Sequence, residues 1–313
     1  MIHRVSDPAN LHNAFFRVEA SEGMAGVDGV SISTFKRSLN ENLYKLSSEL
    51  YEGRYAPLPV LRFLVAKPDG SPRALCVPAV CDRVAQASVL NVVGPLFEAQ
   101  FEEVSFAYRK GRSIRQAAWR IKELRERGYR YLVEADIDSF FDTVDHELLL
   151  AKVAGVVSDQ RVVRLIRLWV EAQVYDGEKV YTLEKGICQG SVISPVLANL
   201  FLDEFDEALL KRGYQLVRYS DDFIVLTKSL SEAEKALECT EEVLNRLHLV
   251  LDPEDTRVTD FDKGFKYLGL VFQGGSIFAP FVRPAKDRRI LYMPPSFDLA
   301  GYLAGKRSWP EGA

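Results

Sequence analysis

The chain has 313 residues, of which 47% are hydrophobic and 27% charged, and its net charge is −4 at pH 7. The apolar fraction is normal for a globular protein, and the length suits about two domains. No run approaches the roughly 18 apolar residues of a transmembrane helix, and the amino terminus lacks the apolar core of a signal peptide. The four scattered cysteines show neither a zinc spacing nor a disulfide framework. We therefore expect a cytoplasmic protein with reduced thiols and no membrane association.

Helical and extended segments alternate along the chain. Residues 9–53 read as helical, with an interruption at Gly26-Val27-Asp28-Gly29. Residues 58–77 read as a β-hairpin around Pro68-Asp69-Gly70. Apolar residues at helical spacing predict further helices. These cover residues 81–101, 114–127, 146–153, 159–171, 195–211 and 230–247.

A predicted strand ends at an acidic residue near the middle of the chain. Residues 133–142 read VEADIDSFFD, and Asp136 stands where the apolar run gives way to polar residues. A strand-end carboxylate that faces a cleft suits Mg²⁺, which takes one or two carboxylates and completes its shell with water and phosphate oxygens. The ordinary alternative is a carboxylate that caps the next segment. This segment alone leaves both interpretations open.

A glycine-rich loop leads into the helix predicted at residues 195–211. Residues 186–195 read GICQGSVISP, and glycine lets a ligand or another backbone approach closely. Ser194 followed by Pro195 predicts an N-cap and a first helical turn. An ordinary junction between a loop and a helix would have the same composition.

Two adjacent carboxylates stand at a predicted hairpin tip. Residues 214–218 and 223–226 read as short strands, and Tyr219-Ser220-Asp221-Asp222 joins them. Like charges this close repel each other unless a cation neutralises them, so the pair indicates a divalent metal site. Asp-Asp is also common in plain turns. Together with Asp136, the pair would supply the two-metal arrangement used for phosphoryl transfer.

These three segments occur in the order found in reverse transcriptases, and the chain resembles the bacterial, group II intron-like lineage from about residue 25 to about residue 272. The resemblance extends to an amino-terminal block, a fingers hairpin, a template-proximal block and a primer-grip region. These blocks are Gly26-Val27-Asp28-Gly29, residues 67–73 (KPDGSPR), residues 105–113 (SFAYRKGRS) and residues 265–269 (FKYLG).

The resemblance implies an α+β fold, the right-hand polymerase fold, with fingers, a ferredoxin-like palm sheet and a thumb that is minimal or absent. Residues 1–132 would form an amino-terminal extension and fingers, with the palm beginning within residues 78–132. Residues 133–272 would form the palm with the catalytic motifs and the primer-grip region. Residues 273–313 would form a short basic tail or the remnant of a thumb.

The resemblance also assigns catalytic residues. Asp136 and Asp221 would hold two Mg²⁺ ions, with Mn²⁺ as an alternative, and the Ile137 carbonyl would be an extra ligand. Asp222 would assist them. One ion would activate the primer 3′-hydroxyl and the other would stabilise the departing pyrophosphate.

The substrates would be deoxynucleoside triphosphates. Lys67 and Arg73 would contact the triphosphate, since lysine offers a point charge and arginine a fork of donors. Both residues also flank a turn that they could simply solvate. Phe141 lies five positions after Asp136, at the place of the family's steric gate, where a ring would clash with a ribose 2′-hydroxyl; it equally fits a core position. Gln189 would pack against the new base pair.

The expected template and primer contacts come from several blocks. They are Arg109, Arg112, Gly190, Tyr219, Leu268 and Gly269. A local basic track can bind phosphates even though the net charge is negative. Basic residues run from Arg109 to Arg130, where the stretch from Lys122 onward fits a solvated helix better. They recur in the tail as Arg283, Lys286, Arg288, Arg289, Lys306 and Arg307.

The chain departs from the family at two points. Asp255 stands before Thr256, where many relatives carry lysine, so a role for that lysine in protonating pyrophosphate is in doubt. Only some forty residues follow the primer-grip block, which leaves no room for a helical maturase domain or an endonuclease. The thumb would then be minimal, or would be replaced by nucleic acid or a partner protein.

We therefore expect an RNA-directed DNA polymerase that extends a DNA or RNA primer on an RNA template. The sequence of residues 105–109 and the short carboxy-terminal segment resemble the CRISPR-associated branch. This resemblance predicts a role in spacer acquisition with the CRISPR integrase as a partner, or another role in phage defence. Two alternatives are an RNA-binding scaffold of polymerase fold with weak catalysis, and group II intron retrotransposition. The intact set of three aspartates favours the polymerase.

Overall fold

The computed structural model describes residues 1–67, 70–279 and 289–307. Its helices are α1 (Ile2–Val5), α2 (Pro8–Ala20), α3 (Ile32–Arg37), α4 (Leu39–Glu52), α5 (Val80–Glu98), α6 (Ile114–Glu126), α7 (Phe140–Thr143), α8 (His146–Val156), α9 (Gln160–Val170), α10 (Ser194–Lys211), α11 (Leu230–Arg246) and α12 (Leu299–Arg307). Its strands are β1 (Val60–Ala66), β2 (Pro72–Val77), β3 (Tyr131–Ala135), β4 (Gln173–Tyr175), β5 (Val180–Thr182), β6 (Gln215–Tyr219), β7 (Asp222–Thr227), β8 (Arg257–Asp260), β9 (Phe265–Tyr267), β10 (Leu270–Gln273), β11 (Ser276–Phe278) and β12 (Ile290–Tyr292).

An antiparallel sheet of four strands carries the segments singled out in the sequence. Its order is β6-β7-β3-β8, and β3 pairs with both β7 and β8. Helix α10 connects the region after β3 to β6, and α11 connects β7 to β8. This order and these connections are those of a ferredoxin-like βαββαβ unit. The palm sheet predicted from the resemblance is confirmed.

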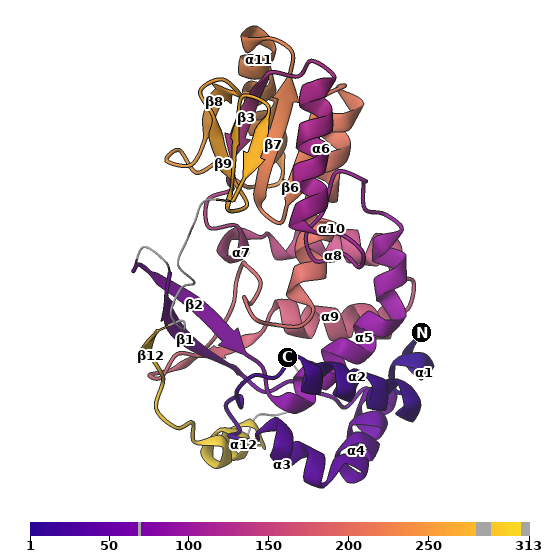
Figure 1. Ribbon diagram of the computed structural model, residues 1–313. Helices are drawn as coiled ribbons and strands as arrows, with labels where there is room; N and C mark the ends of the chain where they lie inside the picture. The colour runs from indigo at the N-terminus through magenta and orange to yellow at the C-terminus, as the bar shows by residue number, and fades with distance from the viewer. Residues whose placement is uncertain (68–69, 280–288, 308–313) are drawn as a thin grey trace.

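Both faces of the palm sheet are covered, which explains why its strands read as continuous apolar runs. Successive side chains of a strand point to opposite faces. Val133 and Val225 pack into the main core with α10 and α11. Leu132 and Ile224 pack on the other face with α6 and the small sheet β9–β11. Figure 1 shows α6 along one side of this upper lobe and α11 at its top.

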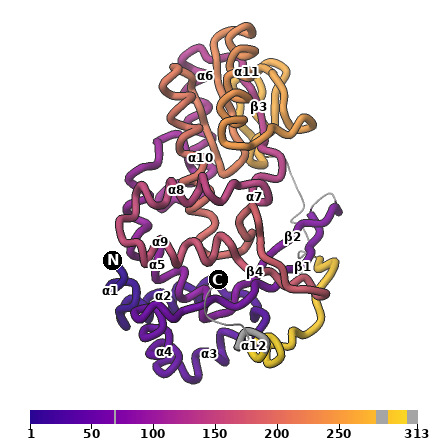
Figure 2. The backbone as a smooth tube through the Cα atoms, turned by 180° about the vertical axis from the view of Figure 1, so that it is seen from behind, coloured from indigo at the N-terminus to yellow at the C-terminus, as the bar shows by residue number. Residues whose placement is uncertain are grey.

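A second sheet lies in the lower lobe and combines three separate stretches of chain. Strand β1 forms the predicted hairpin with β2, pairs in parallel with β4, and pairs with β12 near the end of the chain. Helices α1–α5 lie in the same lobe as this sheet, and in the view from behind α8 and α9 lie between the two lobes (Figure 2). The sequence reading of residues 9–53 as interrupted helices is confirmed by α2, α3 and α4.

Local capping explains several of the helix starts. Ser229 and Glu232 form a capping box at the start of α11, and the Asp145 carboxylate accepts from the Leu148 backbone at the start of α8. The predicted N-cap at Ser194 is one residue off. Ile193 already has helical φ and ψ and occupies the N-cap position without a side-chain bond, so Ser194 is the first residue of α10.

Two sequence predictions fall partly beyond the described ranges. Residues 68–69 of the fingers hairpin lie outside them, as do Arg283, Lys286 and Arg288 of the basic tail, and the side chains of Lys306 and Arg307 are likewise not described. No helix in the described part of the chain has both the length and the apolar character needed to cross a membrane.

Candidate active site

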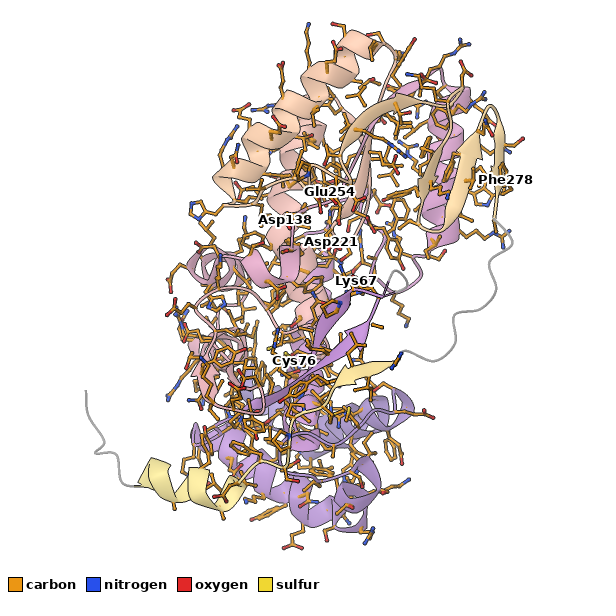
Figure 3. The ribbon with its side chains drawn as sticks, turned by 90° about the vertical axis from the view of Figure 1, so that its left-hand side faces the viewer. Lys67, Cys76, Asp138, Asp221, Glu254 and Phe278 are labelled. Carbon is orange, nitrogen blue, oxygen red and sulfur yellow. The ribbon has the colours of Figure 1, made fainter. Side chains whose placement is uncertain are left out.

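The three aspartates meet at one end of the palm sheet. Asp136 follows β3 directly, Asp222 begins β7, and Asp221 lies in the turn before it. Because β3 and β7 are neighbours, with Ala135 opposite Phe223, the residues beyond this pair lie side by side. All three line a cleft of about 630 Å³. Figure 3 shows Asp221 and Asp138 on the palm side of this cleft and Lys67 at the end of β1 facing them.

The turn that carries two of the aspartates is tight. Tyr219 pairs with Asp222, so Ser220 and Asp221 form a two-residue connection between β6 and β7. Ser220 has φ of 66°, the left-handed conformation that such turns require. This geometry projects the Asp221 carboxylate beyond the end of the sheet and into the cleft.

Burial and mutual repulsion raise the pKa values of two of these carboxyl groups. Burial, and after it the charges of Asp221 and Asp222, raises the pKa of Asp136 to about 7. Burial and the charge of Asp221 raise the pKa of Asp222 to about 6. The Ile137 backbone N–H donates to Asp136 at 2.9 Å and opposes the rise. Both shifts mean that the ionised cluster lacks positive charge nearby, a need that a bound cation would meet.

The donor set fits a divalent ion of the hard class. Asp136, Asp221 and Asp222 offer carboxylate oxygens, and the Ile137 backbone borders the same cleft. Within the residues that the structure describes, no three acidic, histidine or cysteine side chains converge closely enough to enclose an ion on their own. Mg²⁺ does not need three enclosing side chains, because it is commonly held by one or two carboxylates and keeps several waters and substrate phosphate oxygens in its shell.

The predicted nucleotide contacts belong to the same cleft as the aspartates. Lys67, Arg73, Phe141 and Gln189 all line it. The Arg73 Nε donates to the Gln189 side-chain oxygen at 2.8 Å, which ties the fingers hairpin to the glycine-rich loop. The Phe141 side chain is buried and packs edge-on against Phe140. It therefore combines the core position and the cleft-lining position that the sequence left as alternatives.

Gly190 allows close contact between two backbone segments and is not among the residues that line the cleft. Its φ is 107°, and a Cβ atom at this position would lie 2.4 Å from the Cys76 carbonyl oxygen. The preceding residue accepts a hydrogen bond from the Cys76 N–H at 2.7 Å. The loop can therefore lie directly against β2 because residue 190 has no side chain. Gly190 borders a separate cavity behind this loop, away from the aspartates.

Two predicted template contacts lie elsewhere. The Arg109 side chain is 4% exposed, and its guanidinium binds Glu98 and the carbonyls of Phe101, Glu102 and Ser105. Arg109 thus holds its own segment together and presents no donor to the cleft. Arg112 pairs with Glu103 and lines a different surface groove beside Trp119. A basic residue next to a glycine turn looks the same in sequence whether it binds phosphate or carbonyls, which explains the error for Arg109.

The remaining predicted contacts divide between the cleft and its neighbourhood. Tyr219 lines the cleft. Leu268 and Gly269 form the turn between β9 and β10, both with positive φ, and are not among the residues that line it. The adjoining Tyr267 fastens this hairpin to the palm, since its hydroxyl donates toward the carbonyls of Val217 at 3.2 Å and Asp222 at 3.1 Å.

Comparison with known proteins decides the family. The family model of reverse transcriptases (RNA-dependent DNA polymerases) matches residues 65–272. The chain belongs to the reverse transcriptase family. The matched range contains the palm sheet and all three aspartates, and the predicted right-hand polymerase fold is confirmed.

Relatives of this reverse transcriptase include group II intron proteins. Protein YkfC of Escherichia coli is 31% identical over 86% of this chain and 81% of its own length. The group II intron-encoded protein LtrA of Lactococcus lactis is 31% identical over 69% of this chain, which spans 36% of LtrA. A solved telomerase from Candida albicans has a TM-score of 0.56 at 15% identity, covering 72% of this chain and 47% of that one, and so shares the fold. The predicted group II intron-like lineage is confirmed.

Several cleft residues of this reverse transcriptase were not assigned from the sequence. Tyr108 lines the cleft with its ring half exposed and a φ of 58°. Asp252 and Asp255 line it as well, because the Asp252 N–H donates to the Asp136 carbonyl at 2.9 Å and draws this segment to the catalytic strand. The replacement of a lysine by Asp255 was visible in the sequence, but its place in the cleft depends on that backbone contact.

Proposed function

We propose that this reverse transcriptase is an RNA-directed DNA polymerase that extends a DNA or RNA primer with deoxynucleotides on an RNA template. The observation that carries the proposal is the meeting of Asp136, Asp221 and Asp222 in one cleft with Lys67 and Arg73 opposite. Family membership supports the same chemistry. Acidic groups on the palm side and basic groups on the fingers side suit a metal-bound triphosphate placed between them.

The three aspartates and the Ile137 carbonyl would hold Mg²⁺, with Mn²⁺ as an alternative. When bound, such ions lower the pKa of an attacking hydroxyl and neutralise charge on the phosphates. The protein itself contributes position. Partial desolvation and neighbouring carboxylates raise the pKa values of Asp136 and Asp222, so a bound cation would offset the cost of keeping both groups ionised.

The fingers side would bind and orient the nucleotide. Lys67 offers a point charge and Arg73 a fork of donors to the triphosphate. The Gln189 side-chain oxygen accepts a hydrogen bond from Arg73. The residue that would contact the new base pair is therefore bonded to the residue that would contact the triphosphate. Phe141 would exclude a ribose 2′-hydroxyl. Tyr219, with Leu268 and Gly269 on the neighbouring hairpin, would contact the primer and template, and Arg112 the template at a greater distance.

The pathway and the partners are a further step. The resemblance of residues 105–109 to CRISPR-associated enzymes leads us to propose CRISPR adaptation integrase proteins as partners. We also propose that the chain divides into functional parts after residues 132 and 272. Intron retrotransposition, as the similarity to LtrA would allow, is the second candidate. Co-purification with the encoded neighbours of the gene would distinguish the two pathways.

Primer extension tests the activity. Purified protein, Mg²⁺ and deoxynucleotides are supplied with matched RNA and DNA templates, and products are resolved by length. We expect extension on RNA that is lost when Asp221→Ala and Asp222→Ala are combined. Asp262→Ala, in the exposed turn between β8 and β9, is the matched control and should leave extension unchanged. Binding of nucleic acid without extension by the native chain would instead support the scaffold alternative.

A further inference from the structure

A buried ion pair lies directly behind the catalytic turn. Arg218 of β6 and Asp206 of α10 are both fully buried. The Arg218 guanidinium donates from Nε to one Asp206 oxygen at 2.7 Å and from Nη2 to the other at 2.5 Å. This forked geometry offsets the cost of removing two charges from water. The pair uses only part of the donor capacity of the guanidinium.

The third arm of Arg218 reaches the turn itself. Its Nη1 donates to the Ser220 carbonyl at 2.9 Å and to the Asn199 side-chain oxygen at 3.0 Å. Ser220 has a positive φ, which is unfavourable for a residue with a side chain and persists where the surroundings hold it. Asp221 follows at once, so the direction of its carboxylate depends on how Ser220 is held.

Asn199 extends this network to the opposite side of the turn. Its amide nitrogen donates to the Ala107 carbonyl at 2.8 Å. Backbone bonds of 2.9 Å join Arg218 to Val104 and Phe106, which aligns that segment beside β6. Ala107 precedes Tyr108, whose ring lines the cleft and whose hydroxyl lies 3.5 Å from the Ser220 side-chain oxygen. A single buried network therefore contacts both the metal-binding turn and Tyr108.

We infer that Arg218 is a positioning residue for polymerisation, acting with Asp206 and Asn199 to fix the Ser220–Asp221 turn and the Tyr108 wall. The inference rests on the proposed polymerase function. Its physical basis is that a small displacement of metal-binding carboxylates lowers the rate of the chemical step strongly, while the affinity for the nucleotide changes little. Arg218 does not touch the reacting atoms; it acts through the Ser220 carbonyl.

A double variant that removes both charges separates the positioning role of Arg218 from its contribution to stability. Removing one partner of a buried ion pair leaves an unpaired charge, whereas replacing both by apolar residues of similar volume is often neutral for stability. We expect the combined change Arg218→Met and Asp206→Leu to lower the unfolding midpoint less than Arg218→Met alone, because it leaves no unpaired charge and only the Ser220 and Asn199 oxygens lose a donor. The bond to Ser220 is lost, so kcat for primer extension should fall by about 10- to 100-fold, with little change in the KM for deoxynucleotides.

Hydrogen exchange gives a readout that does not depend on activity. In the double variant, peptides that cover residues 217–224 and 105–110 should exchange faster than in the native chain, with no metal or nucleotide added. Asn199→Ala is the second variant. It leaves the ion pair and the Arg218 bond to Ser220 in place, and it removes the bonds that join Asn199 to Ala107 and to Arg218. Its effect should be greater on residues 105–110 than on residues 217–224.

Tyr55→Phe is the matched control for simple loss of stability. The Tyr55 hydroxyl is buried, donates to Asp82 at 2.7 Å, and does not line the cleft. This variant should lower stability without changing kcat or exchange at either peptide. Native kcat and native exchange in the folded double variant would overturn the inference; if the double variant does not fold, the same result for Asn199→Ala overturns it. Failure of the native chain to extend a primer would count against the proposed function, and the exchange comparison would still decide whether the network positions the turn.

Discussion

The carboxyl groups of this protein differ in which charged groups surround them. Asp136 and Asp222 share a cleft in which their pKa values are raised, so they gain most from a cation. Asp206, unlike these two, is fully buried, and Arg218 neutralises it through two hydrogen bonds. Aspartate residues thus carry charges without a nearby cation in the cleft and a neutralised charge behind it, according to the groups that surround each side chain.

At the level of one side chain, a change at Phe141 tests the preference for deoxynucleotides over ribonucleotides. Replacing Phe141 by Ala removes the ring that lines the cleft, so a ribose 2′-hydroxyl should fit. We expect the preference for deoxynucleotides over ribonucleotides, as a ratio of kcat/KM values, to fall by at least about tenfold, equivalent to roughly 1.4 kcal/mol. Steady-state kinetics with both substrate types would measure it. The ratio is its own control, because loss of stability lowers both values alike; an unchanged ratio would contradict the assignment.

Asp82 should make stability depend on pH. Burial raises the pKa of Asp82 to about 7, against an unfolded value near 3.9. The folded protein therefore keeps a proton that the unfolded chain releases, so the free energy of unfolding should fall as pH rises from about 4 to about 7, by up to roughly 1.4 kcal/mol per pH unit. Asp82→Asn cannot ionise and should flatten this dependence in urea unfolding at pH 5 and pH 7.5, both with EDTA. Parallel profiles for the two proteins would rule the effect out.

At the level of elements, the cleft depends on close contacts between the loop of residues 186–193 and the fingers hairpin. The Cys76 N–H donates to the Gln189 carbonyl, and Arg73 donates to its side chain. Tyr267 similarly joins the β9–β10 hairpin to β6 and β7. These contacts join elements that are far apart in the sequence.

Gly190→Ala tests the contact between loop and strand. The added methyl group would meet the Cys76 carbonyl, so the loop must move away from β2. We expect a loss of about 2–4 kcal/mol in the free energy of unfolding together with reduced extension. Gly213→Ala is the control, because Gly213 also has positive φ but open space around it, and it should lose only about 1 kcal/mol with activity retained. Equal losses for the two variants would show that backbone strain, not the contact, matters at residue 190.

At the level of the molecule, the active site lies between two lobes that contribute opposite charges. The palm end of the cleft supplies aspartates, and the fingers hairpin supplies Lys67 and Arg73 (Figure 3). The net charge of −4 therefore says little about nucleic-acid binding, because the local distribution of charge decides it.

Metal binding should stabilise the whole protein. An ion that binds the folded state and not the unfolded state adds about 1.4 kcal/mol at ten times its dissociation constant. We expect the thermal unfolding midpoint to rise with Mg²⁺ concentration, to return when EDTA is added, and to stay constant in the protein that carries Asp221→Ala and Asp222→Ala. Differential scanning fluorimetry would measure this. An equal rise in both proteins would place the ion elsewhere.

Much of the site could be predicted because its signals are local. The strand before Asp136 and the hairpin around Asp221 depend on apolar runs and turn residues that are contiguous in the chain. The six helices predicted from residue 81 onward follow from apolar spacing, and their observed bounds differ from the predicted ones by only a few residues, as for α5 and α6. The short helices α7 and α12 were not predicted. The parallel pairing of β1 with β4 had no such signal, because these strands are three to seven residues long and more than one hundred residues apart.

The sequence by itself determined the family, the order of the motifs and the three aspartates, because each depends on residue type and on neighbours along the chain. The tertiary structure alone decided which side chains face the cleft. Arg109 binds carbonyls of its own segment, Tyr108 lines the cleft, and Arg218 donates to the Ser220 carbonyl. The physical reason is that burial and hydrogen-bond partners are set by packing between distant segments, and a residue's identity does not reveal which partner it will meet.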